Sequence, residues 1–128
     1  MMLKELVRRA PITIDSSATL YDVVKIMAEQ NIGFIVVLEN GRMVGVLSER
    51  DVVRTLAERR DFDVKVGEIC KRDIITLPAD ASVEDAAEEM GRHRIRHIVV
   101  VDDAGKLVGV VSARDVLQEL YAQESGTD

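Results

Sequence analysis

The sequence contains little that could cross-link a fold, hold a metal or stack on a base. Of its 128 residues one is a cysteine and none is a tryptophan, and aromatic residues make up 3%. A lone Cys70 cannot form an intramolecular disulfide, and no cysteine cluster offers a zinc site. So few aromatic rings argue against a stacking platform for single-stranded nucleic acid. The core must therefore be aliphatic, which the 47% hydrophobic content allows.

Long apolar runs and an excess of basic residues are missing as well. The longest runs, FIVVL and IVVV, are far too short to span a bilayer, and the start MMLKELVRRAP lacks the apolar stretch of a signal peptide. The net charge of -6 argues against a general DNA binder and against a protein held on an anionic membrane. We therefore expect a cytoplasmic protein without a membrane partner.

What the sequence does contain is an internal repeat. Ile12-Thr13 recurs as Ile75-Thr76, a spacing of 63 residues, and Ala104 is an insertion that raises the spacing to 64. Beyond it, VGVLSERDV at residues 44–52 matches VGVVSARDV at residues 108–116. A register held over this length indicates a tandem duplication. We expect one compact module made of repeat 1 (1–62) and repeat 2 (63–122), followed by a disordered tail (123–128).

Each copy is predicted to form a strand, a helix, a hairpin of two strands and a second helix. Apolar residues at helical spacing mark the first helix of each copy, which starts with a pattern close to a capping box. The hairpin strands are nearly continuous in Val, Ile and Leu, which is typical of strands covered on both faces. The fold class is therefore mixed α/β (α+β). The predicted strands are 12–14, 34–38 and 42–47 in the first copy, and 75–77, 97–101 and 106–111 in the second.

The two hairpins are predicted to turn differently. Asn40-Gly41 is the strongest short signal for a two-residue turn with positive φ at both positions. Asp103-Ala104-Gly105 suits a three-residue loop with the glycine in the left-handed conformation. The inserted residue therefore changes the turn and leaves the strands in register.

The doubled Ser-x-Arg-Asp motif allows two interpretations. As a helix start, the serine is the N-cap and the aspartate, three residues later, reaches back to it. As a ligand site, an arginine that opposes the helix dipole in the first turn indicates a nearby anion such as phosphate, and a carboxylate suits the two hydroxyls of a ribose. The motif residues are Ser48, Arg50, Asp51, Ser112, Arg114 and Asp115.

With these motifs, the chain resembles a CBS-domain pair, also called a Bateman module. The resemblance covers about Leu3 to Tyr121 and rests on ITIDSSATLYDVVKIM…IGFIVVLENGRMVGVLSERDV and on its copy IITLPADASVEDAAEEM…IRHIVVVDDAGKLVGVVSARDV. It implies two β-α-β-β-α repeats related by a pseudo-two-fold axis, with two clefts between them that bind adenosine derivatives. It also implies that the aspartates bind ribose hydroxyls and that the serines contact phosphate or ribose.

The resemblance further implies that each cleft is shared between the repeats. The residues expected to face Asp51 are Ile75, Thr76, Arg96, His97 and Ile98, and those expected to face Asp115 are Ile12, Thr13, Gly33, Phe34 and Ile35. Because the second copy reads GRHRIRH where the first reads AEQNIGF, Arg96 and His97 are candidates for phosphate contacts. We therefore expect the Asp51 cleft to bind phosphorylated nucleotide more tightly than the Asp115 cleft.

The expected function is a regulatory module that binds adenine nucleotides, senses energy or metabolite state and regulates a partner protein. AMP is favoured over ADP or ATP, and the sequence leaves NAD and S-adenosylmethionine open. No catalytic constellation or metal set is found, so we expect no enzyme, no metal and no obligatory cofactor. A homodimer is expected through apolar helix faces containing Val53, Leu56, Val116, Leu117 and Leu120. The alternatives are a nucleic-acid-binding regulator, which the acidic charge argues against, and a purely structural dimerisation module.

Overall fold

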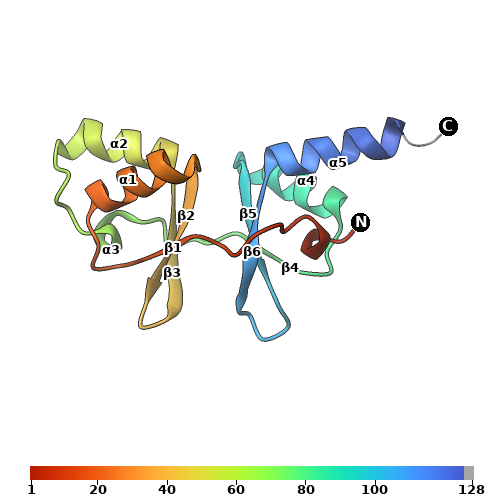
Figure 1. Ribbon diagram of the computed structural model, residues 1–128, viewed down its shortest axis with the longest axis horizontal. Helices are drawn as coiled ribbons and strands as arrows, with labels where there is room; N and C mark the ends of the chain where they lie inside the picture. The colour runs from red at the N-terminus through yellow and green to blue at the C-terminus, as the bar shows by residue number, and fades with distance from the viewer. Residues whose placement is uncertain (126–128) are drawn as a thin grey trace. The chain divides into compact units, whose positions relative to one another are not determined.

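The chain forms two compact packing units. The structure is a computed structural model that describes residues 1–125. One unit comprises residues 12–74 and is called here the β1–β3 unit; the other comprises residues 1–11 with the chain from Ile75 onward and is called the β4–β6 unit. Figure 1 shows the elements of both. Both combine helices with a three-stranded sheet, which confirms the mixed α/β class.

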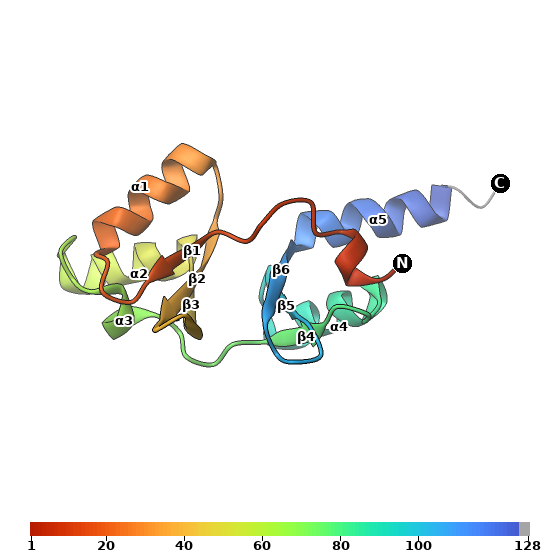
Figure 2. The ribbon, with the colours of Figure 1, turned by 60° about the horizontal axis from the view of Figure 1, so that its bottom comes forward.

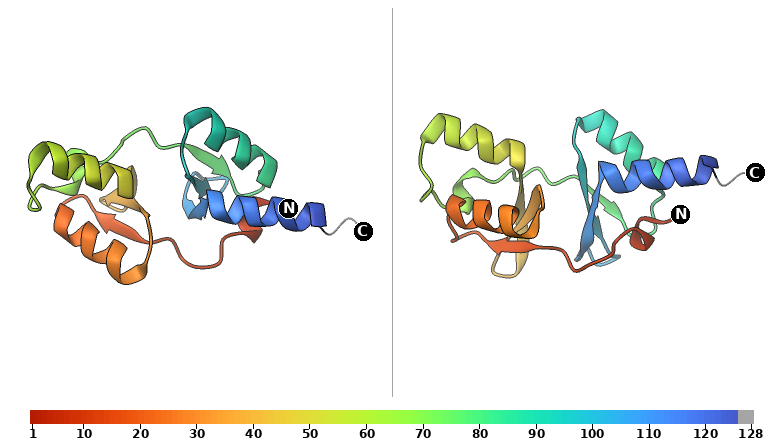
Figure 3. Two further views of the ribbon diagram at one scale, coloured as in Figure 1. Left: turned by 90° about the horizontal axis from the view of Figure 1, so that it is seen from above. Right: turned by 45° about the horizontal axis from the view of Figure 1, so that its top comes forward.

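The β1–β3 unit is a sheet with two helices on one face (Figures 1 and 3). β1 runs parallel to β2, and β2 runs antiparallel to β3. The core between sheet and helices includes Ile35, Leu47, Leu20 and Val23, all 0% exposed. The elements are β1 (Thr13–Asp15), α1 (Leu20–Gln30), β2 (Phe34–Glu39), β3 (Arg42–Ser48), α2 (Glu49–Arg59) and the short α3 (Val66–Ile69).

The β4–β6 unit repeats this arrangement. β4 runs parallel to β5, β5 runs antiparallel to β6, and α4 and α5 cover one face of the sheet. α5 extends three residues beyond the predicted end of repeat 2 at residue 122, and the rest of the predicted tail, residues 126–128, lies outside the described residues. The elements are the 3-10 turn η1 (Leu3–Glu5), β4 (Thr76–Pro78), α4 (Val83–His93), β5 (His97–Val101), β6 (Leu107–Ser112) and α5 (Ala113–Ser125).

The local signals of the sequence are realised in both units. Asn40 and Gly41 have φ of 53° and 77°, and Gly105 has φ of 78°, which confirms both predicted turns. α1 and α4 begin with capping boxes, in which Asp22 and Asp85 accept hydrogen bonds from the backbone of their N-cap residues. Short-range chemistry therefore determined where these hairpins turn and where these helices begin.

The packing units do not coincide with the sequence repeats. The first residues of repeat 1 pack on the body of repeat 2, and Figure 2 shows this N-terminal segment among the elements of the β4–β6 unit. Leu3 is fully buried in the β4–β6 core, and its N–H donates to the Ala81 carbonyl oxygen at 2.9 Å. Reciprocally, the first residues of repeat 2 pack on the body of repeat 1. Val66 is fully buried in the β1–β3 core, and its N–H donates to the Ala18 carbonyl oxygen at 2.8 Å.

A glycine in the last strand of each unit makes room for this segment. A Cβ on Gly45 would overlap the Cys70 side chain and the Lys71 carbonyl oxygen, and a Cβ on Gly109 would overlap the Val7 side chain. Cys70 is half-buried there, where burial raises the pKa of its thiol and keeps it protonated. The glycines therefore allow the exchanged segments to approach the sheets closely.

The outer faces of α2 and α5 differ from the expected apolar surface. Val116 is only 2% exposed and belongs to the β4–β6 core, and Leu56 and Leu120 pack against the cores of their units. Val53 and Leu117, which occupy equivalent positions in the two copies, remain 67% and 66% exposed. Helical periodicity turns neighbouring residues to different faces, so only part of the predicted set is available to a partner.

Among residues 1–125, no helix is long and apolar enough to cross a bilayer.

The packing of the N-terminal segment on β6 predicts an energetic coupling between Val7 and Gly109. Gly109→Ala should lower the free energy of unfolding by about 1–3 kcal/mol, because the new Cβ overlaps the Val7 methyl groups. Val7→Ala removes those methyl groups, so the double variant should lose less stability than the two single variants together. Urea denaturation of the four proteins measures the coupling.

The matched control is Gly91→Ala in α4. A Cβ on Gly91 meets no atom within 4 Å, so this change should raise the free energy of unfolding by about 0.5–1 kcal/mol. Additive losses for Val7→Ala and Gly109→Ala would contradict the described packing of the N-terminal segment.

Candidate functional site

In each unit, the start of the second helix lies beside the start of the middle strand. In the β1–β3 unit, Ser48 pairs with Phe34 in the sheet register, and the Glu49 N–H donates to the Gly33 carbonyl oxygen at 2.9 Å. The Ile12 carbonyl oxygen accepts from the Val36 N–H at 3.3 Å, which brings the start of β1 to the same edge. The candidate residues of the first copy therefore gather at one edge of their own unit.

The β4–β6 unit gathers the equivalent residues in the same way. Ser112 pairs with His97, and the Ala113 N–H donates to the Arg96 carbonyl oxygen at 2.7 Å. The Ile75 carbonyl oxygen accepts from the Val99 N–H at 3.2 Å. Arg96 and His97 thus lie beside the Ser112 helix start of their own unit, and the expectation that they face Asp51 stays a prediction.

The strand residues among the candidates differ in what they expose. The side chains of Ile35 and Ile98 are fully buried in the two cores. Thr13 is half-buried in β1, and Thr76 is exposed in β4. Of these four side chains, the threonines are the ones at the surface of their units.

Asp51 is held by a complete capping box. Its Oδ2 accepts from the Ser48 N–H and the Ser48 hydroxyl, both at 2.9 Å, and the Ser48 Oγ accepts from the Asp51 N–H at 3.2 Å. The capping interpretation is therefore confirmed for this helix. Asp51 is only 8% exposed, so its carboxylate is fixed in position before any ligand arrives.

The second carboxylate oxygen of Asp51 faces two cations. Its Oδ1 lies 3.8 Å from an Arg54 guanidinium nitrogen and 3.9 Å from the Lys71 Nζ. Sequence reasoning missed both residues. Lys71 lies there because its backbone pairs with Val46 in β3, a contact that no local sequence motif predicts.

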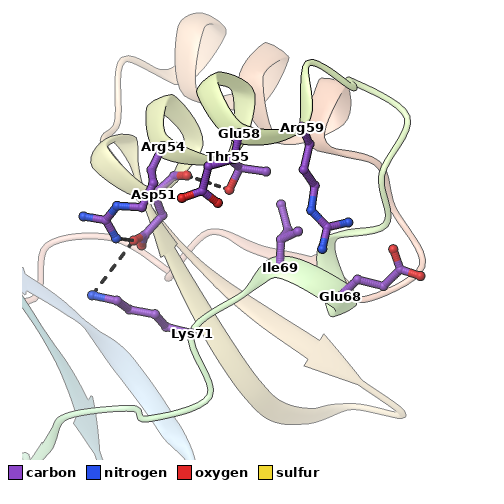
Figure 4. Close-up of a pocket in the computed structure, with 8 residues that line it drawn as sticks. All are labelled: Asp51, Arg54, Thr55, Glu58, Arg59, Glu68, Ile69 and Lys71. Atoms are coloured by element: carbon purple, nitrogen blue, oxygen red, sulfur yellow. Dashed lines mark hydrogen bonds and ion pairs between the residues drawn. The ribbon is translucent and has the colours of Figure 1, made fainter.

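A hollow of about 220 Å³ opens beside Asp51 between α2 on one side and α3 with the segment that follows it on the other (Figure 4). Figure 4 shows Lys71 and Arg54 directed at the Asp51 carboxylate. The charged residues that line the hollow are Asp51, Glu58, Glu68, Arg54, Arg59 and Lys71. Acids and bases balance, so the hollow is polar without favouring an anion.

Asp115 is capped similarly but has different neighbours. Its Oδ2 accepts from the Ser112 N–H at 2.9 Å, and its N–H donates to the Ser112 Oγ at 3.1 Å. The carboxylate acts on His97: burial holds the pKa of His97 below its usual range, Asp115 opposes this shift, and Arg96 adds to it. An imidazole that is mainly neutral near pH 7 therefore stands beside this helix start.

The motif arginines project from both helix starts. Arg50 and Arg114 are exposed, and within residues 1–125 neither makes an ion pair. The bases on α4 are engaged instead, since Arg92 and His93 lie 3.0 and 3.1 Å from Glu88 and Glu89. Arg50, Arg114 and the exposed Arg96 beside the start of α5 are therefore available to bind an anion.

The described residues contain no group of three or more side chains suited to hold a metal ion. His93 ends α4 and His97 begins β5, so the two histidines do not share one helix face.

A protein-family model described as the CBS domain matches the chain twice, at residues 3–58 and 66–122. The CBS domain-containing protein YhcV of Bacillus subtilis is 32% identical over 114 residues, which cover 88% of this chain and 81% of that protein. The uncharacterized protein MJ1232 of Methanocaldococcus jannaschii is 34% identical over 106 residues, which cover 83% of this chain. The match covers 35% of MJ1232, so this chain corresponds to part of a longer relative.

Two solved structures share the fold along nearly the whole chain. The CBS domain protein PAE2072 from Pyrobaculum aerophilum, complexed with AMP, has a TM-score of 0.86 and 37% identity, covering 95% of this chain and 99% of that one. The CBS domain pair of protein MJ0100, in complex with 5′-methylthioadenosine and S-adenosyl-L-methionine, has a TM-score of 0.87 and 27% identity, covering 96% and 98%. These matches confirm the predicted resemblance. The chain belongs to the CBS-domain family and carries one CBS domain in each of its two sequence repeats.

Proposed function

We propose that the chain is a regulatory module that binds adenine nucleotides, AMP foremost, at the helix starts of its two units. The observation that carries this proposal is the doubled helix start itself. Each one presents a fixed carboxylate, a serine and an exposed arginine next to the first residues of the middle strand. The AMP complex of a relative that is 37% identical supports the ligand class.

Each group has a role that suits its chemistry. A carboxylate accepts hydrogen bonds from the two ribose hydroxyls, and the Asp51 Oδ1 is the oxygen that the cap does not use. The arginine guanidinium binds phosphate oxygens, since the Glu49 and Asp51 N–H groups of the helix start already donate to Gly33 and Ser48. The half-buried isoleucine at the start of the first strand, Ile12 or Ile75, and the threonine that follows it provide an edge for the base.

Binding is proposed to act through a population shift. A nucleotide that has a higher affinity for one arrangement of the chain increases the population of that arrangement. A change in AMP concentration, and so in energy state, would in this way change how the chain acts on a regulated partner protein.

A purely structural role of the motif is the competing function. The Ser48 hydroxyl and the Asp51 Oδ2 are fully used by the helix cap, so capping alone accounts for these two groups. It does not account for the exposed arginine that recurs at the same position of both motifs, whereas the second Asp51 oxygen already has the ion pairs with Arg54 and Lys71. Ligand binding explains the repeated arginine.

Binding of AMP should stabilise the protein, and the aspartates should be responsible. At a hundredfold excess over the dissociation constant, AMP is expected to raise the free energy of unfolding by about 2.7 kcal/mol. Asp51→Asn with Asp115→Asn keeps an oxygen for each cap but removes the charge, which should weaken AMP binding by about 10- to 100-fold. Isothermal titration calorimetry and thermal shift measure both effects.

Asp85→Asn is the matched control for these two variants. Asp85 holds the same position in the capping box of α4, where Ser82 is the N-cap, but lies outside the candidate site. It should lower stability similarly and leave AMP affinity unchanged. Loss of AMP binding in Asp85→Asn would mean that the aspartates act only by holding helices together.

Binding of AMP should also take up protons through His97. Burial keeps the His97 imidazole mainly neutral near pH 7, and a phosphate placed beside it favours the charged form, as Asp115 already does. Affinity should therefore rise as pH falls through the pKa that His97 has in the complex toward its lower pKa in the free protein. His97→Phe gives this position the residue of the first copy, Phe34, and should flatten the profile; an unchanged slope in titration calorimetry would contradict the assignment.

A homodimer is proposed through the exposed equivalent residues Val53 and Leu117. Apolar side chains that are 67% and 66% exposed at the same position of α2 and α5 suit a two-fold interface. Val53→Glu with Leu117→Glu should yield a monomer in sedimentation equilibrium. Stability of each unit should change by less than about 0.5 kcal/mol at high dilution, because both side chains point to solvent. A monomeric wild-type protein would refute this interface.

A further inference from the structure

The outer faces of α2 and α5 carry apolar side chains of different size. α5 exposes Leu117 and Tyr121, and Tyr121 is 73% exposed. A spacing of four residues places both side chains on the same face of the helix. The equivalent positions of α2 are the exposed Val53 and Ala57. The duplication thus kept an apolar strip on both helices, with small side chains on α2 and large ones on α5.

Packing within the units does not explain these residues. The buried side of α2 includes Val52 and Thr55, and the buried side of α5 includes Val116. The leucine and the tyrosine on the outer face of α5 add nothing to that core. Large apolar side chains gathered on one exposed face are typical of a surface that another protein covers.

The helix layers of the two units also differ in charge. α1 and α2 carry four basic and five acidic residues, so their charges nearly balance. α4 and α5 carry two basic residues and His93 against seven acidic ones. Among the exposed residues, Lys25 of α1 corresponds to Glu88 of α4. The helix layer of the β4–β6 unit is therefore strongly acidic, and that of the β1–β3 unit is close to neutral.

We infer that these two different faces form one dimer interface, in which the helix layer of the β1–β3 unit packs on the helix layer of the β4–β6 unit of a second copy. The inference rests on the proposed homodimer and adds which unit meets which. A two-fold axis makes the contact reciprocal, so the same pairing forms twice in the dimer. The small Val53 and Ala57 of one chain then face the large Leu117 and Tyr121 of the other.

The alternative arrangement packs each unit on the equivalent unit of the second copy. It would place Tyr121 of both chains in one contact, which overfills it, and Ala57 of both chains in the other, which leaves a gap. It would also bring two strongly acidic helix layers together, where like charges repel each other. Pairing of unlike units avoids both problems, because large side chains meet small ones and an acidic layer meets one whose charges nearly balance.

Cysteine cross-linking distinguishes the two arrangements. Val53→Cys and Leu117→Cys are made as separate proteins in a Cys70→Ala background, which removes the native thiol. Oxidation after subunit exchange should join position 53 of one chain to position 117 of the other, because a disulfide forms only between side chains that lie against each other. The mixture should give about tenfold more covalent dimer than either protein alone. Mass spectrometry of the linked peptides identifies the joined positions.

A charge exchange tests the same contact without a covalent bond. Val53→Glu with Leu117→Lys should remain dimeric in sedimentation equilibrium, because pairing of unlike units sets each glutamate against a lysine. The dissociation constant should be about tenfold lower than that of the matched control, Val53→Glu with Leu117→Glu, and should rise with salt concentration. Pairing of like units would instead oppose glutamate to glutamate and lysine to lysine, and both variants would be monomers.

The results separate the arrangement of the dimer from the dimer itself. Cross-linking of either single-cysteine protein alone at the yield of the mixture overturns the inference and leaves the homodimer standing. A dimer in which no sample cross-links and both charge variants dissociate equally also overturns it. A monomeric wild-type protein refutes the proposed homodimer together with the inference. None of these results bears on AMP binding, which calorimetry measures separately.

Discussion

The short backbone hydrogen bond between the second helix and the start of the middle strand is the constraint on which both candidate sites depend. It joins Glu49 to Gly33 in one unit and Ala113 to Arg96 in the other. Because these are main-chain atoms, the bond forms whatever side chains stand there. It holds the first turn of the helix beside the first strand residues, so the serine N-cap and the aspartate bonded to it lie at the same edge in both units. The duplication could therefore diverge in charge without losing the geometry.

In the exchange of the two leading segments, each unit takes the start of the other sequence repeat into its core. Residues 1–11 reach the β4–β6 unit from a distant part of the chain, whereas the β1–β3 unit is continuous over residues 12–74. Leu3 is buried with residues of the second repeat, and Val66 with residues of the first. The glycines of β3 and β6 let these segments lie close to the sheets. Lys71 reaches Asp51 only because of this packing, so the exchange also determines which cations stand beside the carboxylate. A domain boundary drawn between the repeats in sequence would separate residues that share a core.

Helix capping and the proposed ligand binding use the same carboxylate in each unit. An aspartate at the third helical position is held by backbone and serine hydrogen bonds through one oxygen, which leaves the other oxygen oriented but unused by the cap. A group fixed in this way loses little conformational freedom when a ligand arrives. The capping and ligand interpretations of the motif are therefore compatible, since the first prepares the second.

The sequence by itself determined the duplication, the order of the elements, both hairpin turns and the starts of the helices. These features depend on contacts between residues close in the chain, such as Asn40 with Gly41 or Ser48 with Asp51, and local chemistry decides them. Only the tertiary structure decided that Val116 is buried, that Lys71 faces Asp51 and that Arg96 stands beside the Asp115 helix start. Each of these depends on which distant segment packs or pairs with which, and periodicity does not carry that information. The sequence thus identified the candidate residues, and the packing of the chain determined their neighbours.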